Sequence, residues 1–464
     1  MRQCLNPNKS VYPFILVIGL FFILISPKFF TDGMFLDGVW YATLSKNLAD
    51  GFSSIWVPRL TETQYAWGQP PLAMILESPF FMLGNSLYLA KIYSVLTYIC
   101  TGCIMYLVWR ELGGKNNFFW IVLLVWIVVP TVFWAATENV LENTMSIFVM
   151  LSVLMYLKSI RTHRILYVLM SGIMLTLAFL TKGFTGLYPL AFPLIYWIFI
   201  RKETLLYSVA DTMLMFAALV LPILVLWFFS PGANSFLKTY VEVQVLGSME
   251  HAQIVDHHYA IVISFFREIL LSLAVVLVVV IVAVKQKVMS ESMKNMDFRL
   301  SSALGVLALS GVVPMMVSLI QRDFYIITVF PIFALAVGVA MEPVLENISL
   351  SRTFSCWVKI ISLVMLVMAV AVNVFFAGKA GRDKDLLEDV YLISAEIPES
   401  TVIGASKGMY EKWSMTGYFY FLNKTSLDYK EGYDYYLCDK TETPKDSTYI
   451  LCVKGIDLQL FKKP

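Results

Sequence analysis

Long apolar runs recur along this chain, and they constrain its fold more than any other feature. Each run has roughly the twenty residues that a helix needs to cross the hydrocarbon core of a bilayer. The runs cover residues 11–30, 88–109, 118–135, 140–157, 165–180, 184–200, 205–229, 269–284, 300–319, 324–341 and 357–376. We therefore expect a mainly α-helical, polytopic membrane bundle with about eleven transmembrane helices.

The composition agrees with a membrane protein and excludes other classes. Hydrophobic residues make up 58% of the 464-residue chain and charged residues only 15%, whereas roughly a quarter of a soluble domain is charged. The net charge of +2 says nothing about nucleic acid, but the lack of a basic run predicts no nucleic-acid partner. The first apolar run is too long for a signal-peptide core and has no small-residue cleavage site, so we expect it to be retained.

The short apolar stretch 70–83 is expected to lie at the membrane surface. It opens with two prolines and contains Glu77 and Pro79, and segments of this length are more often interfacial than spanning. If it does not span, one side of the membrane receives most short-loop cations, namely Arg2, Lys9, Arg110, Lys115, Lys158, Arg161, Arg164, Arg201, Lys202, Lys285, Lys287, Lys294, Arg299 and Arg352. The opposite short loops carry only Lys46, Arg59, Lys182, Lys238, Arg267 and Arg322.

This charge asymmetry predicts the orientation of the chain. The positive-inside rule places the N-terminus in the cytoplasm. The outer side then holds a first large loop, 31–87, and a second, 230–266. After an odd number of crossings, the segment 377–464 lies on the outer side, apart from the transmembrane domain 1–376; in a bacterial inner membrane, which the family resemblance given below implies, this side is the periplasm.

The C-terminal segment 377–464 is polar, rich in tyrosine and punctuated by glycine and proline. Its pattern predicts strands at 401–404, 417–422, 433–438 and 449–453, and hence a small mixed α/β domain. Cys438 and Cys452 fall within it. An oxidising compartment would allow a disulfide between them, and two unpaired thiols are the alternative.

Charged residues at the predicted outer helix ends are the candidates for chemistry. Asp37 follows the first apolar run, and a carboxylate at the mouth of a membrane bundle is costly unless it has a role. Lys182 lies between two apolar runs with almost no loop, so we expect it to have an anionic partner. The other candidates on this side are Arg59, Glu138, Glu142, Arg322 and Tyr325.

These residue types suit proton and phosphate chemistry. A carboxylate can accept the proton of an attacking hydroxyl, while arginine and lysine stabilise a phosphate group. Glu138 and Glu142 are one helical turn apart, so we expect them on one helix face, where they can position an acceptor or a metal. The structural alternatives are a helix cap for Asp37 and interface anchors for Arg59 or Glu138.

The second outer loop holds three of the four histidines. His251, Asp256, His257 and His258 match no closed zinc motif. We therefore favour contact of His258 with substrate over a dedicated metal site. No cofactor is expected to be required, and a divalent cation is the alternative.

The order of these residues resembles a known family, the bacterial branch of the protein O-mannosyltransferase superfamily, which includes the lipid A aminoarabinose transferases. In that family an acidic residue follows the first helix, then an aromatic residue, a Trp-x-x-Pro and a Lys-Pro-Pro-Leu. The corresponding segments here are Asp37-Gly38-Val39-Trp40-Tyr41, Trp56-Val57-Pro58-Arg59 and Gln69-Pro70-Pro71-Leu72.

The later motifs follow in the family's order, over most of residues 11–340. They are Leu141-Glu142-Asn143, Leu180-Thr181-Lys182-Gly183, His258-Tyr259 and Arg322-Asp323-Phe324-Tyr325 with Pro331. The resemblance implies the type C membrane glycosyltransferase fold and a juxtamembrane helix at 70–83. It also implies that Asp37 is the catalytic carboxylate and that Lys182 contacts a lipid phosphate.

Two departures from the family pattern concern the first outer loop. Gly38 and Trp40 stand where the family has a glutamate and a nearby arginine, and Gln69 replaces the lysine of Lys-Pro-Pro. Arg59 can substitute for the missing cation. These changes leave the fold expectation intact and leave the sugar and the acceptor open.

The combined hypothesis is an inverting transfer of a sugar from a polyprenyl-phosphate donor to a lipid, glycan or protein acceptor. Asp37 is the expected base, and the expected donor-phosphate contacts are Lys182, Arg322, Tyr325 and Arg59. The expected acceptor-positioning residues are Glu142, Glu138, Tyr41 and His258. The rivals are a lipid-linked oligosaccharide ligase or oligosaccharyltransferase, a secondary transporter, and an inactive relative that binds lipid.

Overall fold

The computed structural model describes residues 8–247, 255–349 and 351–464. Contacts divide the chain into two compact units: 1–26, 95–136 and 141–375 form the first, and 27–94, 137–140 and 376–464 form the second. The helices before the second large loop are α1 (Asn8–Phe29), α2 (Leu36–Ala49), α3 (Leu72–Phe81), α4 (Leu87–Glu111), η1 (Asn116–Phe118), α5 (Phe119–Ile127), α6 (Pro130–Ala135), α7 (Leu141–Ser159), α8 (Arg164–Lys182), η2 (Phe184–Gly186), η3 (Tyr188–Ala191), α9 (Phe192–Ile200) and α10 (Leu205–Phe229).

The remaining elements follow in chain order. The helices are α11 (Pro231–Tyr240), η4 (Val241–Leu246), α13 (Ala260–Glu268), α14 (Leu270–Lys285), α15 (Met289–Lys294), α16 (Phe298–Val312), η5 (Val313–Val317), η6 (Asp323–Val329), α17 (Phe330–Asn347), α18 (Arg352–Phe376), α19 (Lys384–Ser394), α20 (Lys407–Tyr410) and α21 (Trp413–Asn423). The strands are β1 (Val402–Ala405), β2 (Ser426–Asp428), β3 (Tyr435–Asp439), β4 (Ile450–Lys454) and β5 (Leu458–Lys462).

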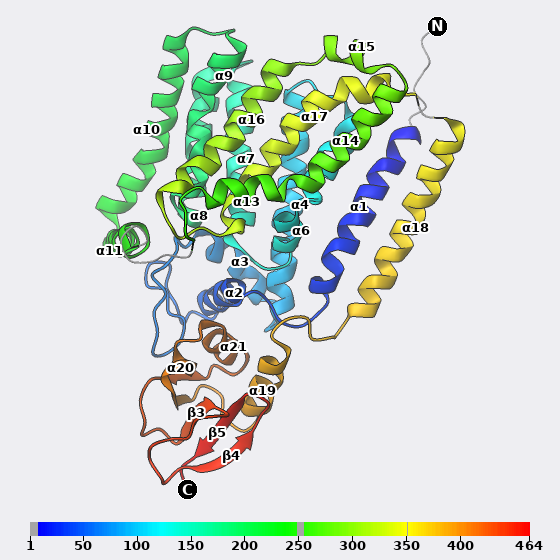
Figure 1. Ribbon diagram of the computed structural model, residues 1–464. Helices are drawn as coiled ribbons and strands as arrows, with labels where there is room; N and C mark the ends of the chain where they lie inside the picture. Colours follow the sequence, from blue (N-terminus) through cyan, green and yellow to red (C-terminus); the bar gives the residue numbers. More distant parts are fainter. Residues whose placement is uncertain (1–7, 248–254, 350) are drawn as a thin grey trace. The chain divides into compact units, whose positions relative to one another are not determined.

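The protein is a multi-pass membrane protein. In the described residues, 8 helices are long and apolar enough to span a bilayer, and the pair α13 and α14, bent by 42°, makes up to 9 (Figure 1). The long spans lie in α1, α4, α7, α8, α10, α16 with η5, η6 with α17, and α18. The predicted mainly helical bundle is confirmed, but the count of about eleven is not.

Two of the predicted spans are interrupted by proline. The run 118–135 breaks between α5 and α6, where Pro130 begins the second helix. The run 184–200 divides into η2, η3 and α9, and both Pro189 and Pro193 stand at the start of a piece. Proline lacks an N–H and disfavours helical backbone in the residue before it, which a count of apolar residues does not register.

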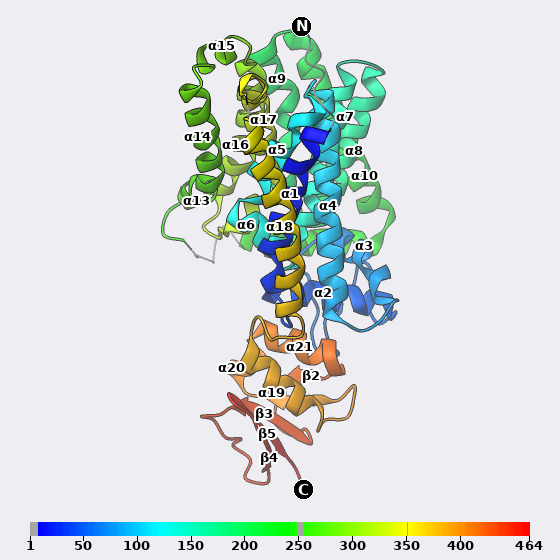
Figure 2. The same ribbon diagram turned by 90° about the vertical axis from the view of Figure 1, so that its right-hand side faces the viewer.

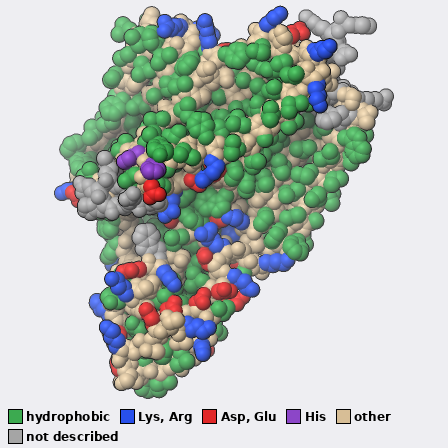
Figure 3. All heavy atoms as spheres, in the orientation of Figure 1, with side chains coloured by type: hydrophobic (Ala, Val, Ile, Leu, Met, Phe, Trp, Pro, Cys, Tyr) green, Lys and Arg blue, Asp and Glu red, His purple; other side chains and the backbone are tan. Residues whose placement is uncertain are grey.

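Helices α1 and α18 lie side by side in both ribbon views (Figures 1 and 2). Ser362 on α18 donates a hydrogen bond to the Tyr12 carbonyl at 2.8 Å. A Cβ at Gly19 would lie 3.2 Å from Met365, so glycine permits the close approach of the two helices. The outward side chains of α14 and α18 are large and apolar, including Val278 and Val367, and hydrophobic side chains cover the helices in Figure 3. This surface suits contact with lipid.

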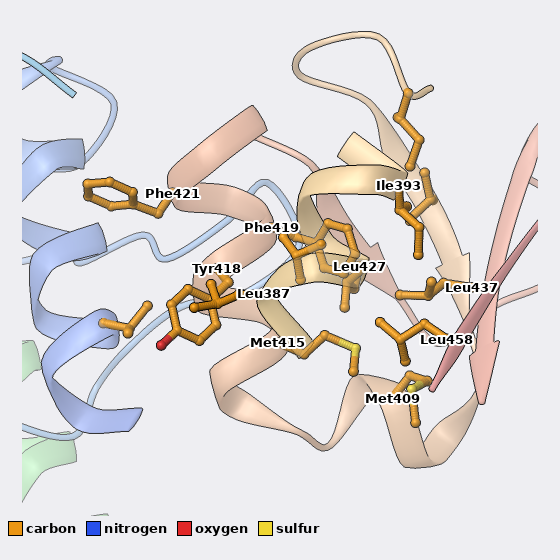
Figure 4. Packing of buried hydrophobic residues seen from close by; sticks show 14 of the residues in the cluster. Leu387, Ile393, Met409, Met415, Tyr418, Phe419, Phe421, Leu427, Leu437 and Leu458 are labelled. Carbon is orange, nitrogen blue, oxygen red and sulfur yellow. The ribbon is translucent and has the colours of Figure 1, made fainter. Parts of the chain in front are cut away.

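In the second unit, the first outer segment and the C-terminal segment share one hydrophobic core. Met34, Val39 and Ala42 pack in the same cluster as Leu387 and Tyr418, part of which is shown in Figure 4. The Tyr418 hydroxyl accepts from the Met34 N–H and donates to the Met34 carbonyl, both at 3.0 Å. The same unit contains the helix α3, which was predicted not to span the membrane. It has only 10 residues.

The C-terminal segment forms a five-stranded sheet in the order β2-β1-β3-β5-β4. Strand β1 is parallel to β2 and β3, whereas β5 is antiparallel to β3 and β4. The predicted mixed α/β domain is confirmed, as are strands near 401–404, 433–438 and 449–453. The strand predicted at 417–422 is wrong, because these aromatic residues belong to α21, which packs against α2.

Of the two alternatives left open for Cys438 and Cys452, a disulfide or two unpaired thiols, the structure has the unpaired thiols. Strand β5 lies between β3 and β4, so the two cysteines are two strands apart. Two strand spacings are about 9–10 Å, beyond the roughly 4.4–6.8 Å between the Cα atoms of a disulfide. Both thiols are free, and burial raises the pKa of Cys438 to about 12.

Asp389 on α19 ties the β4–β5 turn to the helix. Its buried carboxylate accepts hydrogen bonds from the N–H groups of Ile456, Asp457 and Leu458 at 2.6–2.9 Å.

We expect Asp389→Ala to cost about 3 kcal/mol of local stability, because buried donors lose their acceptor. Hydrogen exchange of the full-length protein in detergent would measure this as lost protection in β4 and β5. Its exposed neighbour provides the control: Glu388→Ala should cost less than about 1 kcal/mol, and equal losses for the two variants would contradict the assignment.

Candidate functional site

Asp37 lies half-buried in the first turn of α2. A negative side chain is favourable there because helix N–H groups and the helix dipole point toward it. The N-cap residue Phe35 donates its N–H to Glu138 Oε2 at 2.6 Å. Glu138 also forms an ion pair with Lys28, at 2.8 Å. The start of the helix that carries Asp37 is therefore fixed by a buried carboxylate.

The turn 137–140 packs directly against this first turn of α2. A Cβ at Gly38 would lie 2.2 Å from the Glu138 carbonyl oxygen, so only glycine fits at this position. Asn139, with φ of 51°, donates its side-chain amide to the Gly38 carbonyl at 3.3 Å. The departure of Gly38 from the family pattern thus has a structural reason beside Asp37.

The prediction that Glu138 and Glu142 share a helix face is wrong. Helix α7 begins at Leu141, so Glu138 lies in the turn before it. The left-handed backbone of Asn139 ends any helical periodicity between the two glutamates. Glu138 belongs to the second unit and Glu142 to the first.

In the first unit, Lys182 forms a buried ion pair with Glu142. The two side chains are only 7% and 0% exposed. Lys182 is the last residue of α8 and Glu142 lies in the first turn of α7. Each charge therefore also interacts favourably with the dipole at its own helix end. The anionic partner predicted for Lys182 is confirmed.

Two aromatic rings complete the surroundings of Lys182. Its Nζ lies 5.1 Å from the ring centroid of Phe324 and 4.5 Å from that of Tyr325, both in η6. Helix α8 stops directly after Lys182, because Gly183 adopts φ of 84°. A Cβ at Gly183 would lie 1.8 Å from the Tyr240 hydroxyl oxygen, so α11 approaches the backbone at this point. The structure therefore brings together Glu142, Lys182 and Tyr325.

Side-chain hydrogen bonds join the end of the second outer loop to the segment that begins η6. The buried Gln321 side chain donates to the His258 carbonyl at 2.8 Å and accepts from the Ile261 N–H at 2.7 Å. His258 is exposed, and its Nδ1 lies 2.6 Å from the Met316 carbonyl. Asp323 accepts from Ser264 and pairs with Arg267, at 2.7 and 2.5 Å.

Arg322 precedes η6 and is exposed. No carboxylate in the described part of the chain forms an ion pair with its guanidinium. Arginine is a good ligand for phosphate because its donors are planar and paired. Within the first unit it is therefore a cation whose charge is not neutralised by a described carboxylate.

Arg59 and Tyr41 belong to the second unit with Asp37 and Glu138. The Arg59 guanidinium donates to the Tyr65 hydroxyl at 3.0 Å, and the Arg59 carbonyl accepts from Asn47 on α2 at 2.8 Å. Its loop is thus attached to α2, while the charged group stays at the surface. Tyr41 is buried.

Among the described residues, no three His, Cys, Asp or Glu side chains form a group that could hold a metal ion. His251 lies outside the described residues. Sequence reasoning missed the roles of Lys28, Glu77 and Asn139. A carboxylate inside the otherwise apolar helix α3 was the available signal for Glu77, whereas nothing local marked the other two.

No family model and no curated protein matches this sequence. The structure is similar to ArnT from Cupriavidus metallidurans bound to undecaprenyl phosphate, with a TM-score of 0.64 over 98% of both chains at 14% identity. It is equally similar to that protein in the apo state, with a TM-score of 0.64 over 96% of both chains at 13% identity. The predicted type C membrane glycosyltransferase fold is thereby confirmed.

A third similar structure is an oligosaccharyltransferase of Archaeoglobus fulgidus tethered with an acceptor peptide. It is 13% identical and aligns over 89% of this chain and 63% of that one, with a TM-score of 0.46.

The buried pair makes a prediction about stability. Lys182→Met should destabilise the protein by about 3–5 kcal/mol because it leaves the Glu142 carboxylate buried and unpaired, and the double variant with Glu142→Leu should recover most of that loss. Thermal unfolding of the full-length protein in detergent would measure both. As a control, Lys115→Met removes an exposed ion pair with Glu346 and should cost less than about 1 kcal/mol. A double variant as unstable as the sum of the single variants would contradict this account.

Proposed function

We propose that this protein is an inverting glycosyltransferase that takes a sugar from a polyprenyl-phosphate donor. The transfer would occur on the extracytoplasmic face of a bacterial inner membrane, to a hydroxyl of a lipid, glycan or protein. The proposed reaction requires no cofactor, and the alternative is a reaction that uses a divalent cation. The proposal assigns Asp37 as the catalytic base.

The observation that carries this proposal is the support built around Asp37. Glu138 fixes the Phe35 N–H, and the turn at Asn139 fixes the Gly38 carbonyl. A base must be held in one geometry to act on a bound hydroxyl. Asp37 itself is half-buried and lies where two fixed backbone groups flank it.

Asp37 takes the proton of the acceptor hydroxyl, and the oxygen forms a bond to the anomeric carbon from the side opposite the phosphate. The bond between that carbon and the phosphate oxygen breaks, and its electron pair leaves with the phosphate. Attack from the opposite side inverts the configuration of the sugar.

The donor phosphate needs cations, and the first unit offers them. Arg322 is exposed and is not paired with a described carboxylate, whereas Lys182 is already paired with Glu142. We assign Arg322 as the direct phosphate ligand and Lys182, with Tyr325, as a second contact to the same group. Arg59 is assigned a peripheral role in donor binding because its guanidinium is held by Tyr65.

We assign Glu142, Tyr41 and His258 to positioning the acceptor. Glu138 is assigned to the same role, and it also holds the start of α2. The fold likeness supports the donor class, because the ArnT structure contains undecaprenyl phosphate. A shared fold does not fix a substrate, so the sugar and acceptor are left to experiment.

The test compares lipid-linked sugars and surface glycans by mass spectrometry in cells with and without the protein. Loss of the protein should raise one polyprenyl-phosphate monosaccharide and remove its sugar from an acceptor. Asp37→Asn should behave like the loss, because removing a general base costs roughly 10²–10⁴ in rate. Asp50→Asn, at the exposed C-cap of the same helix, should behave like the wild type.

The outcomes separate the rivals. An accumulated lipid-linked oligosaccharide would favour an oligosaccharide ligase. Unchanged sugars in every strain would favour a transporter. Full restoration by Asp37→Asn at normal expression would reject Asp37 as the base.

A second prediction concerns the affinity for the donor lipid. It is measured with the purified full-length protein in detergent, and undecaprenyl phosphate is the probe. Arg322→Gln should weaken binding about tenfold, or about 1.4 kcal/mol, through the loss of a charge-assisted contact. Lys238→Gln removes an exposed cation of α11 and should leave the affinity unchanged. Equal effects of both changes would indicate only a general electrostatic contribution and would remove Arg322 from the site.

A further inference from the structure

Glu77 is a carboxyl group buried inside the apolar helix α3. It is only 2% exposed, and it forms no ion pair with any described residue. Its two hydrogen bonds go to neutral groups: Oε2 lies 2.7 Å from the Ser45 hydroxyl and Oε1 lies 2.8 Å from the Asn139 amide nitrogen. A buried carboxylate without a cation is costly, so its protonation state needs a specific explanation.

The hydrogen atoms around Ser45 supply that explanation. The Ser45 oxygen lies 2.8 Å from the Tyr41 carbonyl, which can only accept a hydrogen bond. A serine hydroxyl has one hydrogen, so Ser45 cannot donate to both the Tyr41 carbonyl and Glu77 Oε2. Each contact has a hydrogen of its own only when Glu77 carries a proton. The count therefore favours an uncharged carboxylic acid that donates to Ser45.

The other oxygen of Glu77 orients Asn139. The Asn139 amide nitrogen has two hydrogens, and its two acceptors are Glu77 Oε1 and the Gly38 carbonyl. Because the Gly38 carbonyl can only accept, the amide must present its nitrogen to both groups. Asn139 also has the strained left-handed backbone of the turn, which a fixed side chain helps to hold. The chain of contacts thus runs from Glu77 to the residue that follows Asp37.

We propose that Glu77 is a positioning residue for the transfer proposed above: as a neutral acid it holds Ser45 and Asn139, and through Asn139 it fixes the Gly38 carbonyl beside Asp37. This inference rests on the proposed function for its catalytic meaning. The hydrogen-bond arrangement itself can be tested without any activity.

Burial supports the neutral form, since it raises the pKa of Glu77 to about 8 despite the opposing hydrogen bonds from Ser45 and Asn139. Helix α3 contacts α2, the turn 137–140, the start of α4 through Tyr93, and α21 through Phe421. The titratable residues on these elements are Asp37, Tyr41, Lys46, Glu138, Tyr88, Lys91, Tyr93, Tyr418 and Tyr420. None of them shares a hydrogen bond or ion pair with Glu77.

The test replaces Glu77 in the full-length protein with glutamine or with leucine. Glu77→Gln places an amide N–H where the acid proton stood and keeps an acceptor for Asn139, so it should retain at least half of the turnover at pH 7. Glu77→Leu keeps the volume but removes both hydrogen bonds, and it should lose at least tenfold in kcat with little change in KM. The substrate source is the lipid extract of cells that lack the protein.

The pH profile separates positioning from simple structural support. Turnover of the wild type should fall above pH 8, because ionised Glu77 can no longer donate to Ser45. Glu77→Gln cannot ionise, so its activity should persist to higher pH. Hydrogen exchange of residues 36–49 provides the readout without activity, and it should show wild-type protection for Glu77→Gln and faster exchange for Glu77→Leu.

Two results would overturn the proposal. One is a Glu77→Gln variant that loses turnover and α2 protection as severely as Glu77→Leu, which would indicate a functional carboxylate. The other is an identical high-pH decline in the wild type and Glu77→Gln. A different result would reject the proposed transfer itself, namely an Asp37→Asn variant that keeps its activity. In that case the hydrogen-exchange comparison still decides whether Glu77 fixes α2.

Discussion

The absence of water in the hydrocarbon core is the constraint on which the rest of this structure depends. Backbone groups there must pair with one another, so the chain crosses as helices. Irregular backbone is tolerated only where it is enclosed by protein. Regular helix ends at enclosed points here: α8 stops at the buried Gly183, and the 3₁₀ turns of η6 hold Phe324 and Tyr325 against Lys182. The candidate donor residues lie where regular helix gives way.

Three buried carboxyl groups illustrate three ways of meeting the cost of burial. Glu142 is paired with Lys182, and Glu138 is satisfied by Lys28 and a backbone N–H. Glu77 has only neutral partners, for which a retained proton is the consistent solution. Each arrangement fixes a helix end or a turn within its own unit, so groups that offset the electrostatic cost of burial also fix the local backbone.

The predictions from sequence succeeded where one local pattern determines the outcome. Runs of apolar residues identified the long membrane helices, although they overcounted the spans, and the lack of a loop around Lys182 indicated its anionic partner. The predictions failed, or left alternatives open, where neighbours distant in sequence decide. The aromatic segment 417–422 reads as a strand but forms a helix against α2. Strand β5 separates Cys438 from Cys452, although these two lie close together in the sequence.

The sequence by itself determined that the chain is a multi-pass helical membrane protein with a small mixed α/β segment, because hydropathy and strand periodicity are local properties. It also indicated which charged residues lie near helix ends. Only the tertiary structure decided which of them meet. Glu142 faces Lys182, while Glu138 turns to Phe35 because Asn139 reverses the backbone between the two glutamates. Partner choice depends on how separate helices pack, and spacing along the chain does not contain that information.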